Sequence, residues 1–98
     1  DRNDNLYVNE IAPRVHNSGH LTINAYNVSQ FENHVRAVCS LGQIPIKKLS
    51  NAEMLNLIGN QIIPYRENPN LSNNQFLFDY LKKDIKEKRK MGHLTILK

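Results

Sequence analysis

Residues 9–20 concentrate the side chains of this chain that could do chemistry. Within this segment lie the carboxylate of Glu10, the guanidinium of Arg14, two imidazoles, an amide and a hydroxyl. A carboxylate oxygen is a suitable ligand for a Mg²⁺ ion that bridges phosphates, and a guanidinium binds phosphate or carboxylate through paired hydrogen bonds. The mixture predicts a site for a charged small molecule and a metal ion rather than a segment that only fills a core.

The residues before this segment are expected to form the strand that positions Glu10. Leu6, Val8 and Glu10 alternate with their neighbours at period two, which is typical of a strand. Glu10 then shares a face with two apolar side chains, and a carboxylate buried there needs a cation or another partner. A simple ion pair with Arg14 is the structural alternative.

A polar loop is expected to follow this strand. Pro13 ends regular pairing, and Gly19 permits a close approach to a ligand. Both residues disfavour a helix, so His16 and His20 are not expected to converge on a zinc ion as two histidines four apart on a helix would.

Residues 9–20 resemble the signature of the 5-(carboxyamino)imidazole ribonucleotide synthases, which are ATP-grasp enzymes of purine biosynthesis. Residues 29–38, 54–59 and 89–95 resemble later segments of that family, in the same order. The resemblance implies an α+β fold. Residues 1–42 would end an ATP-grasp domain (strand, substrate loop, helix), and residues 43–98 would form a small β-rich, barrel-sandwich-like domain. It also implies a C-terminal fragment whose nucleotide-binding regions lie upstream, so that the fragment alone is expected to be inactive.

The resemblance implies a reaction and a role for each residue of the signature. ATP would activate bicarbonate as carboxyphosphate, and the amine of 5-aminoimidazole ribonucleotide would capture the carboxyl group as a carbamate, releasing ADP and phosphate. Glu10 would hold Mg²⁺. Arg14 would bind the carboxyphosphate or bicarbonate anion, and His16, whose imidazole can act as a general acid or base, would move the amine's proton. Asn17 and Ser18 would orient the imidazole of the substrate.

A basic cluster lies near the end of the chain. Residues 82–98 carry seven basic and two acidic side chains, a net charge of +5 against +4 for the whole chain. For most of these lysines a solvated turn is the simpler interpretation. The resemblance matches Lys83 and Arg89 to residues that grip the ribonucleotide's phosphate. The sequence departs from the family at two places: Lys82 stands where the family has a glycine, and residues 86–88 replace the family's Arg-Pro-Gly turn. Which of Lys83, Lys86 and Arg89 contacts the phosphate therefore stays open.

The remaining pattern predicts the supporting elements. Ser29 and Glu32 form a capping box that starts a helix with apolar residues at helical spacing and an ion pair between Glu32 and Arg36, and Gly42 is its expected stop. Residues 43–50 are expected to be a connector, 54–58 and 91–97 strands, and 59–72 a loop. Residues 76–81 fit a strand or a helix by pattern, and the resemblance favours the strand.

Composition limits the classes of function. The single Cys39 excludes an internal disulfide and fits a reducing compartment such as the cytoplasm, and no apolar run reaches the length of a membrane span. The resemblance implies a homodimer for the full-length protein. Two alternatives remain: the related formate-dependent glycinamide ribonucleotide transformylase, whose loop tends to read His-Asp-Thr, and a non-catalytic phosphate- or RNA-binding module. The basic cluster lacks the interleaved aromatic residues typical of nucleic-acid stacking, so no nucleic-acid partner is expected.

Overall fold

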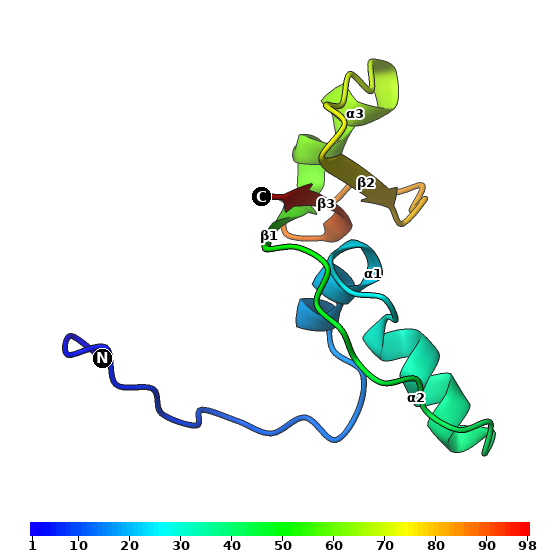
Figure 1. Ribbon diagram of the computed structural model, residues 1–98. Coiled ribbons are helices and arrows are strands. Elements are labelled where there is room, and N and C mark those ends of the chain that lie inside the picture. Colours follow the sequence, from blue (N-terminus) through cyan, green and yellow to red (C-terminus); the bar gives the residue numbers. More distant parts are fainter.

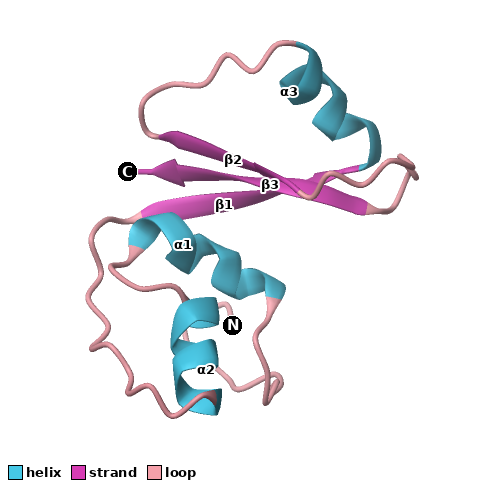
Figure 2. Cartoon of the chain, turned by 90° about the vertical axis from the view of Figure 1, so that its right-hand side faces the viewer, coloured by secondary structure: helices cyan, strands magenta, loops and turns pink.

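The computed structural model describes residues 1–98 and has the expected α+β fold (Figure 1). Its elements are the 3₁₀ helix η1 (Asn17–Leu21), α1 (Thr22–Ala25), α2 (Gln30–Val38), β1 (Ala52–Ile58), the 3₁₀ helix η2 (Gly59–Ile62), α3 (Ile63–Glu67), β2 (Gln75–Asp79) and β3 (Lys90–Leu97). The helices of the first half lie on one side of the sheet, and α3 lies on the other (Figure 2). No helix is long and apolar enough to cross a bilayer.

The three strands form one antiparallel sheet in the order β1-β3-β2. The central strand β3 is buried on both faces. His93 is paired with Asn56 of β1 and Phe78 of β2, whereas the next residue, Leu94, is paired with two leucines. Because side chains alternate across a strand, one face of the sheet is polar and aromatic, and the other is apolar. The strands predicted at 54–58 and 91–97 are confirmed, and residues 76–81 are mainly strand rather than helix.

The apolar core is small and lies on the leucine face of the sheet. Leu57, Ile62 and Met91 form its buried centre. Met91 lies at a β-bulge, where the register between β1 and β3 shifts, so the simple alternation of faces does not hold there. Ile62 belongs to η2, so the loop predicted over 59–72 is wrong in its first half. Pro64 lies in the first turn of α3, where a missing backbone N–H leaves no helical hydrogen bond unmade. A proline that reads as a loop signal in the sequence therefore starts a helix here.

Helix α2 confirms its predicted start but not its predicted end. The Ser29 side chain accepts a hydrogen bond from the backbone N–H of Glu32 at 3.0 Å, and Glu32 pairs with Arg36 at 3.1 Å. Ser40, not Gly42, takes the left-handed conformation that ends the helix, with φ at 55°. The Leu41 N–H then donates to the Arg36 carbonyl at 2.9 Å, as in a Schellman motif.

The first fifteen residues form an extended arm that leaves the body of the molecule (Figure 1). The strand predicted over 6–11 is wrong in this structure, although its alternating pattern is present. No other segment pairs with the arm, and a strand needs a neighbour to satisfy its backbone hydrogen bonds. Leu6, Val8 and Ile11 are 99%, 86% and 84% exposed. Such a row of uncovered apolar side chains makes self-association of the isolated chain an expected consequence.

Candidate substrate site

The end of the signature folds as the turn η1, because His16 caps it. The His16 side chain accepts a hydrogen bond from the backbone N–H of Ser18 through Nδ1 at 3.3 Å, and the Ser18 hydroxyl lies 3.1 Å from the same nitrogen. The open loop predicted here is therefore wrong, since a side-chain cap replaces the backbone partners that the start of a helix lacks. With Nδ1 accepting, the proton of the neutral imidazole lies on Nε2.

A pocket of about 990 Å³ lies between the end of the arm, α2 and residues 43–46. Arg14 and Ser18 both line it, so the structure brings these two predicted residues together. Gln30 of α2 forms part of its wall and accepts a hydrogen bond from the His16 backbone N–H at 3.4 Å. Gly19 makes this approach possible, because a side chain there would overlap the Gln30 amide.

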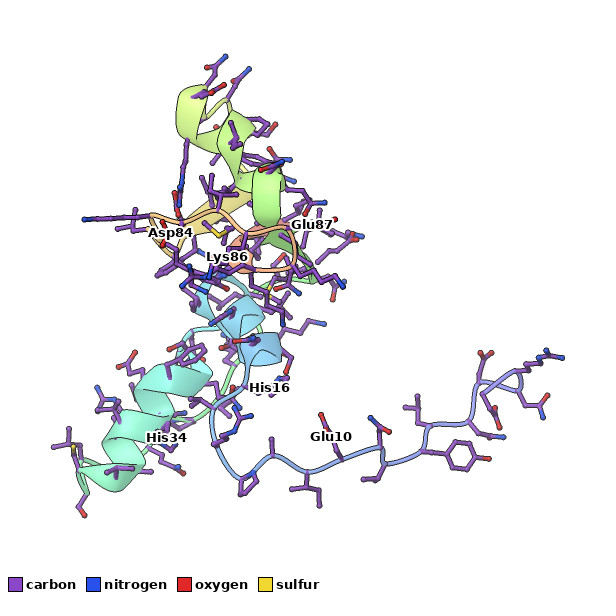
Figure 3. The ribbon with its side chains drawn as sticks, turned by 180° about the vertical axis from the view of Figure 1, so that it is seen from behind. Glu10, His16, His34, Asp84, Lys86 and Glu87 are labelled. Carbon is purple, nitrogen blue, oxygen red and sulfur yellow. The ribbon has the colours of Figure 1, made fainter.

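Glu10 lies apart from the other predicted residues. Figure 3 shows it on the extended arm, away from His16 and from the loop that holds Lys86. It makes neither a hydrogen bond nor an ion pair, so the alternative that it pairs with Arg14 is wrong in this structure. The chain holds no cluster of three side chains able to ligate a metal. A single free carboxylate still suits Mg²⁺, which takes one or two carboxylates and fills its remaining positions with phosphate and water.

The part of the basic cluster that precedes β3, residues 82–89, is a turn between β2 and β3, the basic turn. The Arg89 N–H donates to the Lys86 carbonyl at 2.9 Å, and the Gly59 N–H donates to the Arg89 carbonyl at 2.8 Å. Gly59 has φ at 56°, and a Cβ there would lie 2.7 Å from the Glu87 carbonyl oxygen. The glycine therefore fixes the turn by letting two backbones touch. Arg89 donates to the Asp84 carbonyl at 3.2 Å, whereas Lys83 is exposed and unpaired.

Lys82 is a candidate that sequence reasoning missed. The left-handed residue before the turn is Leu81, with φ at 57°, rather than Lys82, to which the resemblance assigned the family glycine. Lys82 follows it with a half-buried side chain whose Nζ donates to the Lys90 carbonyl at 2.8 Å. The same Nζ lies 5.4 Å from the centre of the Tyr80 ring. The family glycine therefore corresponds in conformation to Leu81, one residue before the position that the resemblance assigned to it.

A second missed feature is a cluster of His20, Tyr80 and His93. His93 is 1% exposed, and burial, with a smaller effect from His20, lowers its pKa to about 4. Burial, followed by the charge of Lys90, also lowers the pKa of His20. Burial raises the pKa of Tyr80. All three groups therefore favour their neutral forms at pH 7, because burial disfavours the charged form of each side chain.

Two family models match the chain. Residues 1–31 match the ATP-grasp domain, and residues 52–98 match the phosphoribosylaminoimidazole carboxylase C-terminal domain. Among curated relatives, the N5-carboxyaminoimidazole ribonucleotide synthase of Bacillus subtilis is 46% identical over 95% of this chain, and the chain covers 24% of it. The Staphylococcus aureus (strain COL) enzyme of the same name is 44% identical over 99% of the chain. This chain thus spans about a quarter of the length of these relatives.

Solved structures agree with these matches. The N5-carboxyaminoimidazole synthetase from Staphylococcus aureus superposes with a TM-score of 0.87 at 43% identity, over 100% of this chain and 27% of that one. The enzyme from Aspergillus clavatus, solved with ADP and 5-aminoimidazole ribonucleotide, gives 0.77 at 36% identity, over 87% of this chain and 24% of that one. The signature, its helix and the terminal sheet all fall within these matches, so the chain is similar over almost its whole length to about a quarter of the N5-carboxyaminoimidazole ribonucleotide synthases.

Proposed function

We propose that this chain works as the C-terminal part of an ATP-dependent ligase that converts 5-aminoimidazole ribonucleotide, bicarbonate and ATP to 5-(carboxyamino)imidazole ribonucleotide, ADP and phosphate. The observation that carries the proposal is the η1 turn, which places Ser18 in the same pocket as Arg14. The chain is also similar to these synthases over almost its whole length. The nucleotide-binding part of the site would come from the remaining three quarters of the enzyme.

Arg14 and η1 would bind the two reacting partners. The Arg14 guanidinium has a fork of N–H donors that matches the planar carboxyl of bicarbonate or carboxyphosphate. Asn17 and Ser18 offer an amide and a hydroxyl at the start of the turn, where they would hydrogen-bond the imidazole of the ribonucleotide. Holding the amine next to the activated carboxyl group would supply much of the rate enhancement through proximity.

His16 has a narrower role in this geometry than its type alone implies. With Nδ1 occupied by the Ser18 N–H, neutral His16 presents Nε2–H, which donates a hydrogen bond. We propose that it donates to an oxygen of the carboxyl group as the carbamate forms. To take the amine's proton, the ring would have to release Ser18 and expose Nδ1.

ATP and Mg²⁺ are the proposed cofactors. Glu10 would be one ligand of Mg²⁺, whose charge neutralises the phosphates during transfer. Ala12 stands where many ATP-grasp relatives carry an asparagine ligand, so a second protein ligand would come from outside this chain.

The phosphate of the ribonucleotide would lie against the basic turn. We propose Lys83 and Arg89 as its binding residues, and the left-handed Leu81 adds Lys82 as a competitor of Lys83 for that role. Lys83 is free, whereas Lys82 would have to leave the Lys90 carbonyl. The proposed boundary between the ATP-grasp region and the terminal domain stays at residues 42–43, between the two matched family models.

The surroundings proposed for the enzyme follow from the family. We propose a cytoplasmic homodimer that acts on small molecules and binds neither nucleic acid nor membrane. The lone, exposed Cys39 is consistent with a reducing compartment. The formate-dependent transformylase is disfavoured, because the relatives reported above are synthases of the carboxyamino type.

Replacing His16 in the complete enzyme tests the proposal. We expect His16→Ala to lower ribonucleotide-dependent ADP release by about 100-fold or more, the usual cost of removing one hydrogen-bond donor that faces a developing negative charge. His16→Asn is the matched control, because asparagine caps a helix well but has no Nε2–H. If His16 takes part in the chemistry, both variants lose the ADP release that depends on the ribonucleotide. Recovery of full activity in His16→Asn would reduce His16 to a cap, and a wild-type enzyme that releases ADP regardless of the ribonucleotide would refute the proposed function.

A further inference from the structure

The Tyr80 hydroxyl bridges two imidazoles that are far apart in the sequence and adjacent in the fold. It lies 3.0 Å from Nδ1 of His20 and 3.0 Å from Nδ1 of His93. His20 belongs to η1, beside the predicted substrate residues Asn17 and Ser18. Tyr80 comes just before the basic turn and His93 a few residues after it, on β3. One hydroxyl therefore joins the two segments that supply the proposed ribonucleotide site.

A stack of four rings crosses the same junction. From α2 to β2, the order is Phe31, His20, His93 and Phe78, with successive centroids 5.1, 4.6 and 5.3 Å apart. The two imidazoles are nearly parallel, with 12° between their planes, and His93 and Phe78 differ by 1°. Offset stacking of this kind holds rings in a fixed relative orientation. The stack limits how η1 can slide over the sheet, and the hydroxyl bridge limits how it can rotate.

The chemistry of the bridge requires a defined proton arrangement. A tyrosine hydroxyl has one proton, so it donates to one Nδ1 and accepts from the other. One imidazole must therefore carry its proton on Nδ1 and the other on Nε2. Burial opposes protonation of both imidazoles, and the charge of Lys90 adds to this effect at His20. The neutral, opposite tautomers are the state that this environment favours.

We propose that Tyr80 is a positioning residue for the ribonucleotide: through His20 and His93 its hydroxyl fixes η1 against the basic turn, and so sets the spacing between the residues that bind the imidazole and those that bind the phosphate. The proposal rests on the proposed function. Tyr80 itself does not touch the substrate in this scheme. The ligand whose binding depends on the bridge is the one that spans both segments, so ATP and bicarbonate are not affected.

The test compares the KM for the ribonucleotide with the KM for ATP in the complete enzyme. We expect Tyr80→Phe to raise the KM for 5-aminoimidazole ribonucleotide about tenfold, because a small misplacement of groups that act together is costly. The KM for ATP is expected to change less than twofold. Tyr65→Phe is the matched control, since Tyr65 packs against the apolar core on the other side of the sheet and its hydroxyl bonds to nothing in the chain. It is expected to leave all constants within twofold of wild type.

A second pair of variants separates the hydrogen bond from the stack and serves if Tyr80→Phe does not fold. His20→Phe keeps a ring between Phe31 and His93 but loses the bond to Tyr80, whereas His20→Asn keeps a polar atom near the Nδ1 position and loses the ring. We expect His20→Phe to raise the KM for the ribonucleotide as Tyr80→Phe does. In His20→Asn, the KM for the ribonucleotide is expected to stay within threefold of the wild-type value.

Three results would overturn the inference. Unchanged ribonucleotide KM in both Tyr80→Phe and His20→Phe would show that the bridge does not position the site. Equal increases in the KM values for ribonucleotide and ATP would indicate general loosening instead. Finally, ¹⁵N shifts showing the same tautomer for His20 and His93 in the wild type would contradict the bridge itself. If the wild-type enzyme ignores the ribonucleotide, the proposed function fails and the positioning role falls with it, while the tautomer measurement still reports on the bridge.

Discussion

Replacing Glu10 with glutamine in the complete enzyme is expected to lower the rate of ADP formation by about 100-fold or more at ordinary Mg²⁺ concentrations. Glutamine keeps the length and one oxygen of the side chain but removes its charge. A metal ion that neutralises the transferring phosphates contributes several kcal/mol, and a loss of about 2.7 kcal/mol in transition-state stabilisation is a 100-fold change in rate. Glu10 has no competing partner within the chain, so its charge is available to the metal.

The Mg²⁺ dependence distinguishes a ligand from a structural residue. We expect Glu10→Gln to raise the Mg²⁺ concentration needed for half-maximal rate, and excess Mg²⁺ to recover part of the activity. Glu67→Gln is the control, because Glu67 is an exposed acid at the end of α3 on the other side of the sheet. A Glu10→Gln enzyme with wild-type rate and wild-type Mg²⁺ dependence would remove Glu10 from the metal site.

Acidification is the second large effect, and it acts on the 98-residue chain itself. The free energy of unfolding is expected to fall by roughly 3 kcal/mol between pH 7 and pH 4, given that one pKa unit corresponds to about 1.4 kcal/mol. His93 has a pKa of about 4 in the folded chain against an ordinary value of 6.5. The unfolded chain therefore binds the proton first as the pH falls. This contribution is complete above pH 6.5 and is lost as the pH falls towards 4, and His20 adds to it in the same direction.

Chemical denaturation at a series of pH values measures this loss. The carboxyl group of Asp79 also has a lowered pKa, caused first by its hydrogen bond to Arg66, but its contribution disappears only below its ordinary value of 3.8. The pKa of Glu53 is lowered as well, first by its hydrogen bond to Lys98, but its contribution is lost only as the pH falls below its ordinary value of 4.5, so the window from 6.5 to 4.5 reports on the histidines. His93→Gln is expected to flatten the dependence in that window, whereas His34→Gln, which changes an exposed histidine of α2, is expected to leave it unchanged. The same slope in wild type and His93→Gln would contradict the assignment.

Local signals in the sequence predicted the elements that stabilise themselves locally. The capping box at Ser29 carries its own hydrogen bond, so α2 begins where the pattern indicates. The apolar segment 54–58 and the alternating segment 91–97 also form strands as predicted, although they are far apart in the sequence, because each finds its partner within the chain. Ser40 shows the limit of such signals, because a serine can take the left-handed position that glycine is expected to fill.

The strand that does not form and the histidine cluster that the sequence did not reveal share a different cause, which is dependence on distant partners. Residues 6–11 have the pattern of a strand, but a pattern does not supply the neighbouring strand that hydrogen bonds require. The bridge between His20, Tyr80 and His93 joins residues up to 73 positions apart, and no spacing rule along the sequence connects them. Arg14 and Ser18 were close in sequence and share a pocket, whereas Lys83 and Arg89 lie in a separate turn outside it.

Transfer of the carboxyl carbon is the most direct test of the central claim. The complete enzyme would be incubated with ¹³C-bicarbonate, ATP, Mg²⁺ and 5-aminoimidazole ribonucleotide, and followed by ¹³C NMR beside an assay of ADP. The account predicts a carbamate signal that grows in step with ADP, one for one, and that is absent when the ribonucleotide is omitted. ADP formation without a carbamate signal, or incorporation of ¹³C-formate in place of bicarbonate, would contradict it.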